Sequence, residues 1–338
     1  MSTVSFASEM AGKKKRLTLD EELHEVGLAA ADPRSAESTG RLKVGLRSPR
    51  SFVVARAATL IKDRRLEGFD ELLRDAFTRF LEDPVKSDPG CKAKLAALEA
   101  LDFTESMDAD PFLTGARYVQ KEAAWGPPVD TATGVRGRSV AALARIGYAD
   151  LVLLAGELLD DPESPVRTAA ADALAHYGVR HGACPVLLKL SVGDDDPLVT
   201  LACMSALISL APEVGVPKLR PLLAGKNPEK RELAALAFGQ SGRDDAVELL
   251  IAAVTSCVLE ADREVLLRAL GLHRSDKAAN HLLTIISEGP EKDAKAAVSA
   301  LATRRFEPGM RERALEAGRA NSKVDLRRSL AESFPEEG

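Results

Sequence analysis

Residues 161–174 have the sequence Asp161-Pro-Glu-Ser-Pro-Val-Arg-Thr-Ala-Ala-Ala-Asp-Ala-Leu174. An aspartate followed by proline is a common start of an α-helix, and Val166, Ala170 and Leu174 then recur at helical spacing. Gly178 is a suitable helix end, because glycine readily adopts the left-handed conformation found at helix C-termini. The stretch therefore predicts a short amphipathic helix near residues 165–177.

The same pattern returns along the chain with a nearly constant period. Copies can be aligned on the apolar closing residue of each helix, which is Ile61, Leu101, Leu143, Leu174, Leu207, Phe238, Leu270, Leu301 or Leu330. The closing residues are 40, 42, 31, 33, 31, 32, 31 and 29 positions apart, and alanine stands immediately before seven of them. A period of about 31 residues is typical of stacked repeats, because one such unit cannot bury its apolar face alone.

Each repeat is predicted to be a pair of short helices joined by a polar turn. In the clearest copy the first helix covers 149–159 and Asp160-Asp161-Pro162 forms the turn. The 53 alanines and 47 leucines favour helix, whereas the β-branched and aromatic residues that strands prefer are scarce. We therefore expect an all-α protein of about nine helix pairs, with second helices near 52–61, 90–102, 136–146, 165–177, 197–210, 228–239, 262–272, 292–303 and 323–332.

The string Asp-Pro-x-x-x-Val-Arg-x-x-Ala-Ala-x-Ala-Leu at 161–174 resembles the HEAT repeat, in the short form found in phycobilisome-lyase-like bacterial proteins. The resemblance is strongest at 135–147 and 160–178 and extends over roughly residues 40–335. It implies a right-handed α-solenoid, a superhelix whose second helices line a concave face. The motif specifies an architecture and no activity.

Composition limits the class of protein and divides the chain. Residues 1–39 hold Lys13–Arg16 and many small polar residues, so we expect a flexible basic arm there, with one helix near 17–28, and a solenoid over 40–338. The net charge of −5 argues against a dedicated nucleic-acid coat. The repeat region has no apolar run of the roughly 20 residues that a membrane span needs, and no secretory signal precedes it. Four scattered cysteines favour free thiols and a cytoplasmic location.

Two insertions lengthen the early repeats, one at 80–91 and one at 123–135. The second contains Trp125, the only tryptophan, in the sequence Trp-Gly-Pro-Pro-Val-Asp130, and Tyr118 lies shortly before it. An aromatic side chain on a rigid loop is a typical anchor of a protein interface, and loops on one face of a solenoid often carry its specificity. Trp125, Tyr118 and Asp130 are therefore the candidate partner-binding residues. The alternative is that Trp125 only covers the groove between two repeats.

A basic residue stands seven positions before the closing residue in six copies. A stripe of cations at repeat spacing could follow a phosphate backbone. In HEAT repeats this position usually binds carboxylates and carbonyls of the turns, and Asp160, Asp161, Asp194–Asp196 and Asp262 are available for that role. Both interpretations stay open for Lys94, Arg136, Arg167, Arg231, Arg263 and Lys323.

Catalytic and metal-binding patterns are weak. His176, His181 and Cys184 cross a helix end at Gly178 and lack a closely spaced fourth ligand, so we expect no metal. HEAT-like hydroxylases use repeated His-Glu pairs, but this chain has only His24-Glu25. No phosphate-binding glycine loop or nucleophile elbow is present. We expect no enzymatic activity and no cofactor.

The sequence therefore favours a scaffold or adaptor that binds a protein or peptide along its concave face and its inter-helix loops. The first alternative is nucleic-acid binding, as in the HEAT-like DNA glycosylases, although low aromatic content and acidity argue against it. The second alternative is a bilin-lyase-like protein. The polar terminal repeat, with Arg327, Arg328, Glu332, Glu336 and Glu337, favours a monomer.

Overall fold

The structure, a computed structural model, describes residues 17–257, 259–322 and 325–335. Over these residues the chain consists of helices and one two-stranded hairpin. It divides into two compact units, residues 1–142 and 143–338. Lys13–Arg16, Lys323, Glu336 and Glu337, to which the sequence analysis gave a role, lie outside the described residues.

Unit 1 contains helix pairs and an additional N-terminal helix. The expected second helices near 52–61, 90–102 and 136–146 are confirmed as α3, α6 and α8, and the division between the units falls inside α8. The elements are α1 (Leu19–Leu28), α2 (Ala36–Leu46), α3 (Ser51–Arg64), α4 (Asp70–Arg79), α5 (Pro84–Ser87), η1 (Pro89–Cys91), α6 (Lys92–Phe103), α7 (Asp110–Ala116), β1 (Lys121–Glu122), β2 (Val129–Asp130) and α8 (Thr133–Ile146).

The first helix belongs to the packed part of the chain. α1 contacts α2 and α3, and its Val26 is buried against them. Thr18 and Glu21 form a capping box at its N-terminus, in which each side chain accepts a hydrogen bond from the other residue's backbone. Helical packing therefore begins upstream of residue 40, where the sequence placed the start of the solenoid.

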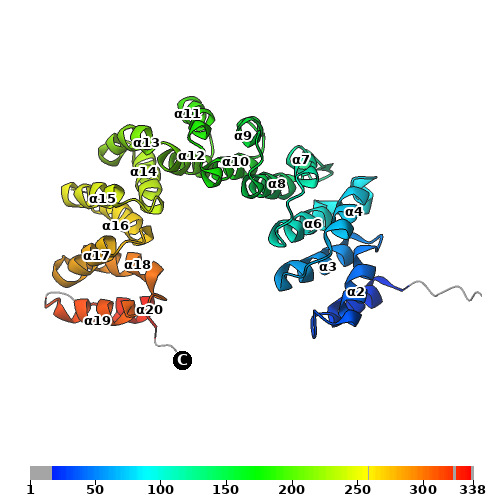
Figure 1. Ribbon diagram of the computed structural model, residues 1–338. Helices are drawn as coiled ribbons and strands as arrows, with labels where there is room; N and C mark the ends of the chain where they lie inside the picture. The colour runs from blue at the N-terminus through cyan, green and yellow to red at the C-terminus, as the bar shows by residue number, and fades with distance from the viewer. Residues whose placement is uncertain (1–16, 258, 323–324, 336–338) are drawn as a thin grey trace, which may run out of the picture. The chain divides into compact units, whose positions relative to one another are not determined.

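Unit 2 continues the helix pairs with short connections. Figure 1 shows its second helices α12, α14, α16 and α18 in one row and its first helices α11, α13, α15 and α17 in another. The elements are α9 (Leu151–Leu158), α10 (Ser164–Tyr177), η2 (Arg180–Gly182), α11 (Ala183–Val192), α12 (Pro197–Leu210), α13 (Pro212–Leu219), η3 (Arg220–Ala224), α14 (Pro228–Gln240), α15 (Asp244–Ser256), α16 (Glu260–Leu272), α17 (Asp276–Glu288), α18 (Glu291–Leu301), η4 (Ala302–Arg304), α19 (Met310–Ala320) and α20 (Arg327–Ser333).

Local signals explain where these helices begin and end. Asp196 and Asn227 accept hydrogen bonds from the N–H groups of Leu198 and Lys230, and proline follows each of them at the first helical position. At the end of α10, Gly178 adopts the left-handed conformation with φ of 75°. The stop at Gly178 is thus confirmed, whereas α10 begins at Ser164 after the N-cap residue Glu163, three residues beyond Asp161.

The alanine that precedes the closing residue lies in a contact layer between second helices. Successive second helices pack on one another, as α10 does on α12 and α14 on α16. All seven of these alanines are at most 5% exposed: Ala100, Ala142, Ala173, Ala206, Ala237, Ala269 and Ala300. A small side chain is therefore needed at this position because no space is left for a larger one.

Replacing Ala173 with leucine is expected to lower the free energy of unfolding by about 1–3 kcal/mol through overpacking. The Ala173 side chain is 2% exposed on α10, so the added atoms must displace packed neighbours. Chemical denaturation of the variant and the wild type measures the difference. An unchanged denaturation midpoint would show that the position tolerates a large side chain.

Candidate functional site

The 123–135 insertion forms the tip and the second strand of a β-hairpin that the sequence did not predict. β1 and β2 pair antiparallel, with Lys121 opposite Asp130 and Glu122 opposite Val129. Residues 123–128, Ala-Ala-Trp-Gly-Pro-Pro, form the exposed tip. The Trp125 side chain is fully exposed, so the groove-covering alternative finds no support.

One side of the hairpin base is held by an ion pair between Asp130 and Arg136 of α8. The two charged atoms lie 2.9 Å apart, and the side chains are 1% and 2% exposed. The other Asp130 oxygen accepts hydrogen bonds from the N–H groups of Ala132 and Gln120. Arg136 also donates to the carbonyl of Tyr118 at 2.9 Å. Asp130 thus fixes the end of β2 to the start of α8 and to the strand beside it.

A second buried ion pair fixes the neighbouring insertion at 80–91. Asp88 and Lys94 have no exposed side-chain surface, and Lys94 Nζ lies 3.0 Å from the Asp88 carboxylate. The Asp88 carboxylate also accepts hydrogen bonds from the N–H groups of Ala93 and Lys94, and so binds the free N–H groups in the first turn of α6. Lys94 Nζ donates to the Phe80 carbonyl and lies 5.5 Å from the centre of the Tyr118 ring.

Glu122 and Gln120 connect the two insertions. One Glu122 oxygen accepts hydrogen bonds of 2.7 Å from the Gly90 N–H, the Gln120 amide and the Thr131 hydroxyl. The Gln120 side-chain amide also donates a hydrogen bond to the Asp88 carbonyl. The side-chain oxygen of Gln120 accepts a hydrogen bond from the Tyr118 hydroxyl. The hairpin base is therefore a hydrogen-bonded network that ties β1, β2 and the α5–α6 connection into one block.

The surroundings of the ionisable groups in this network shift their pKa values. Burial alone would raise the pKa of Glu122 and Asp130, but their hydrogen bonds outweigh it and hold both pKa values below the usual range. Burial, assisted by nearby negative groups, raises the pKa of Tyr118 to about 12. The carboxylates are therefore ionised and the phenol is protonated at neutral pH, which is the state that the hydrogen bonds require.

The three predicted partner-binding residues differ in their exposure to solvent. Trp125 lies at the exposed tip, Tyr118 is half-buried beside the base, and Asp130 is buried within it. Of the three, only Trp125 is fully exposed, while Tyr118 and Asp130 each form a hydrogen bond with Gln120 at the hairpin base. Sequence analysis missed Gln120 and Glu122, because their partners lie in another insertion and no local pattern marks them.

The repeated basic position forms a ladder of ion pairs. In unit 2, Arg167 binds Asp194 through two hydrogen bonds of 2.8 Å, Arg231 pairs with Asp262, and Arg263 pairs with Asp293. Each arginine also donates to the carbonyl six residues before it, namely that of Asp161, Gly225 or Cys257. In unit 1, Lys94 and Arg136 bind the carboxylate six residues before them instead. All five cations therefore join turns within the array.

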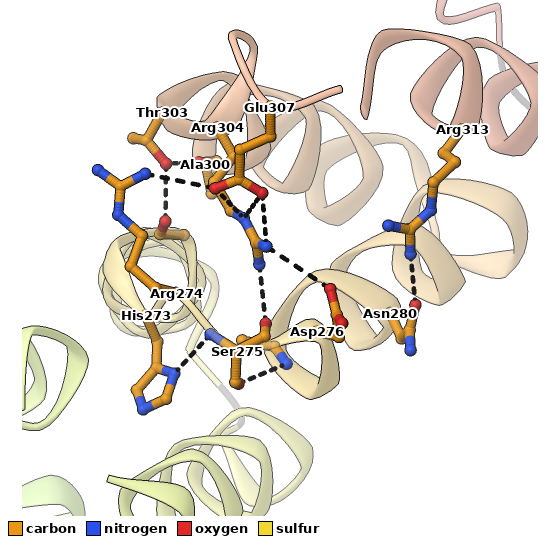
Figure 2. Close-up of polar contacts among 12 residues, drawn as sticks. His273, Arg274, Ser275, Asp276, Asn280, Ala300, Thr303, Arg304, Glu307 and Arg313 are labelled. Carbon is orange, nitrogen blue, oxygen red and sulfur yellow. Dashed lines mark hydrogen bonds and ion pairs between the residues drawn. The ribbon is translucent and has the colours of Figure 1, made fainter. Parts of the chain in front are cut away.

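The repeat that closes with Leu301 has alanine at the basic position, and Arg304, beyond the end of α18, makes a different connection. Figure 2 shows Arg304 between Glu307 and the start of α17, where it donates to the Ser275 carbonyl at 2.7 Å and lies 3.8 Å from Asp276. Arg304 is 3% exposed, and its Nε and Nη2 atoms bind the Glu307 carboxylate at 2.6–2.9 Å. Arg304 thus joins the turn after α18 to the turn between α16 and α17, whereas the ladder cations lie at the starts of the second helices.

The described residues form neither a metal-ligand cluster nor a membrane-spanning helix. Across the described ranges, no three His, Cys, Asp or Glu side chains gather where they could hold a metal ion. No helix among the described residues is long and apolar enough to span a membrane.

Comparison with known proteins agrees with this architecture. Residues 129–208 match the HEAT repeats family, and no curated protein matches the chain. Similar solved structures include human deoxyhypusine hydroxylase in complex with glycerol, 18% identical, covering 78% of this chain and 96% of that one with a TM-score of 0.32. An engineered protein is 17% identical over 94% and 95% of the two chains, with a TM-score of 0.38. The complex of CpcE and CpcF of phycocyanin lyase from Nostoc is 18% identical over 98% and 100%, with a TM-score of 0.33. With its helix pairs and its period of about 31 residues, the chain has an all-α solenoid architecture that contains HEAT repeats over residues 129–208.

Proposed function

We propose that the protein is a non-enzymatic scaffold that binds a protein or peptide along its concave face and loops, with the hairpin tip at Trp125 as the anchor. The observation that carries this proposal is a fully exposed tryptophan on a tip whose base is tied down by buried ion pairs. Large aromatic side chains dominate many protein interfaces, and exposing one to water is unfavourable unless a partner covers it.

Rigidity of the hairpin supports the same proposal. Pro127 and Pro128 restrict the backbone after Trp125, and the network below them leaves the base little freedom. A pre-ordered loop loses less conformational entropy on binding, so more of the contact energy appears as affinity. Val119 and Val129, each more than half exposed, extend the apolar surface beside the strands.

The nucleic-acid alternative receives less support from the ladder. Its five cations already bind carboxylates or carbonyls, so their charge is largely balanced within the array. Binding of phosphates there would require these pairs to break. We therefore keep nucleic acid, and bilin, as outcomes that the binding experiment can reveal.

Replacing Trp125 with alanine is expected to weaken partner binding at least about tenfold while leaving the melting temperature unchanged, because the side chain contacts solvent in the free protein. Tagged wild type and variant are compared by quantitative pull-down from native lysate, with and without nuclease. Each protein that is retained is then titrated in purified form. A variant in which Glu122 and Val129 are joined by Asn-Gly removes the whole tip and should behave in the same way.

Phe306→Ala is the matched control, because Phe306 is an 80% exposed aromatic in another repeat. It should leave partner binding unchanged. Equal binding by wild type, Trp125→Ala and the trimmed hairpin would contradict the anchor role. Retention that disappears with nuclease would favour nucleic acid, and bilin held by the purified protein would favour the lyase-like alternative.

A further inference from the structure

A second surface of unit 1 combines a cleft with cations that have no partner. The cleft has a volume of about 470 Å³ and lies between the loop before α2, one side of α2 and the turn from α3 to α4. We call it the basic cleft, and its polar lining consists of Arg34, Thr39, Lys43, Arg65 and Glu67, with Phe69 on its apolar side. It is separate from the hairpin and from the ladder.

The cations of the basic cleft differ from those of the ladder in their pairing. Within the described part of the chain, Arg34, Lys43 and Arg65 form no ion pair or side-chain hydrogen bond. Residues 40–65 hold eight Lys or Arg against one Asp, so the local excess of positive charge is also large. Three unpaired cations around one hollow attract an anion much more strongly than the same charges spread over a surface.

Arg65 is held in a backbone conformation that favours glycine. It ends α3 with φ of 46° and ψ of 55°, the left-handed region in which a side chain costs free energy. Helices commonly end with glycine at this position. An arginine there gives up stability and places a guanidinium on the rim of the basic cleft, which suggests that the side chain has a use beyond folding.

We propose that the basic cleft binds a small phosphate monoester. Arg65, Arg34 and Lys43 supply the charge-assisted donors that a dianionic phosphate requires. Thr39 and Glu67 line the same hollow, and a hydroxyl and a carboxylate can bind hydroxyl groups of the ester. The volume accommodates a phosphate joined to a group of sugar size, which lies within the range of small-molecule sites.

Calorimetric titration at low ionic strength tests the proposal, with hexose 6-phosphate, inorganic phosphate and the unphosphorylated hexose as probes. We expect the two phosphates to bind and the hexose to give no signal. Tighter binding of hexose 6-phosphate would assign the natural ligand to the sugar phosphates, and equal binding would assign it to inorganic phosphate. Sodium chloride at matched ionic strength controls for screening.

Arg65→Gly separates a binding role from a structural one. Glycine adopts the left-handed conformation without strain, so this variant should unfold at the wild-type temperature or above it while phosphate binding weakens at least about tenfold. Lys43→Gln, an exposed change on α2, should also weaken binding. Arg64→Gln is the matched control, because Arg64 is the neighbouring exposed arginine that does not line the basic cleft.

Two results would overturn the proposal. One is the absence of phosphate binding by the wild type at low ionic strength. The other is equal phosphate affinity in wild type, Arg65→Gly and Arg64→Gln, which would place any bound phosphate elsewhere on the protein.

Discussion

Replacing Asp130 with alanine is expected to lower the free energy of unfolding by about 3–5 kcal/mol, the range measured when one partner of a buried ion pair is removed. Arg136 would remain 2% exposed without the carboxylate that it now binds, and the N–H groups of Ala132 and Gln120 would lose their acceptor. Chemical denaturation followed by circular dichroism measures the change. Because Asp130 lies at the base of the hairpin, the variant should also lose partner binding to the extent that the hairpin unfolds.

Two further variants identify the cause of this loss. Asp130→Leu combined with Arg136→Met replaces both charges with apolar groups and should be clearly more stable than Asp130→Ala, because no buried charge is left unpaired. Glu332→Ala breaks an exposed pair with Arg328 and should cost at most about 0.5 kcal/mol. Equal stability of Asp130→Ala and wild type would mean that the pair contributes nothing to the fold.

Replacing Gly271 with alanine is expected to destabilise unit 2 by about 3 kcal/mol or more, because overpacking against the backbone leaves no flexible neighbour to move. A Cβ atom on Gly271 of α16 would lie 2.3 Å from the Ala300 carbonyl oxygen and 2.8 Å from its carbon, both on α18. Gly239 of α14 has the same relation to Ala269 of α16. The two second helices would have to separate, so the contact between repeats should weaken throughout its length.

The shape of the unfolding curve adds a second readout for Gly271→Ala. Stability in a repeat array depends on coupling between neighbours, so a lesion between α16 and α18 should divide one transition into two. Gly40→Ala on α2 is the control, because its Cβ would meet nothing within 4 Å. That variant should be as stable as the wild type or up to about 1 kcal/mol more stable. Equal effects of the two substitutions on stability would show that the effect of Gly271→Ala comes from helix propensity and not from close packing against α18.

The repeats were predictable because their signals are local and periodic. The interval between closing residues, the Asp-Pro start and the Gly178 stop placed second helices to within a few residues of the observed α10, α12, α14, α16 and α18. Gly239 and Gly271, each directly after a closing residue, carried a further signal of close helix packing that the motif does not include. A period in sequence becomes a period in space because each repeat contacts only its neighbours.

The hairpin was not predictable in the same way. Lys121–Glu122 and Val129–Asp130 are too short to show the alternation of a strand, and nothing local reveals that Glu122 will meet Gly90 from another insertion. Trp125 was recognised by its residue type, but its exposure depends on a base assembled from both insertions. The partners of the ladder cations likewise come from the next repeat, about 30 residues away.

By itself, the sequence determined that the chain is an array of helix pairs and where its second helices lie, because helix propensity, capping and period depend on nearby residues. The tertiary structure decided which charges are paired and which are left free. Arg167 and Arg65 are both arginines near a helix end, yet one is bound by Asp194 and the other lines an open cleft. That difference depends on which carboxylates folding brings within hydrogen-bond distance of each arginine. Such tertiary contacts cannot be read from the sequence around either arginine.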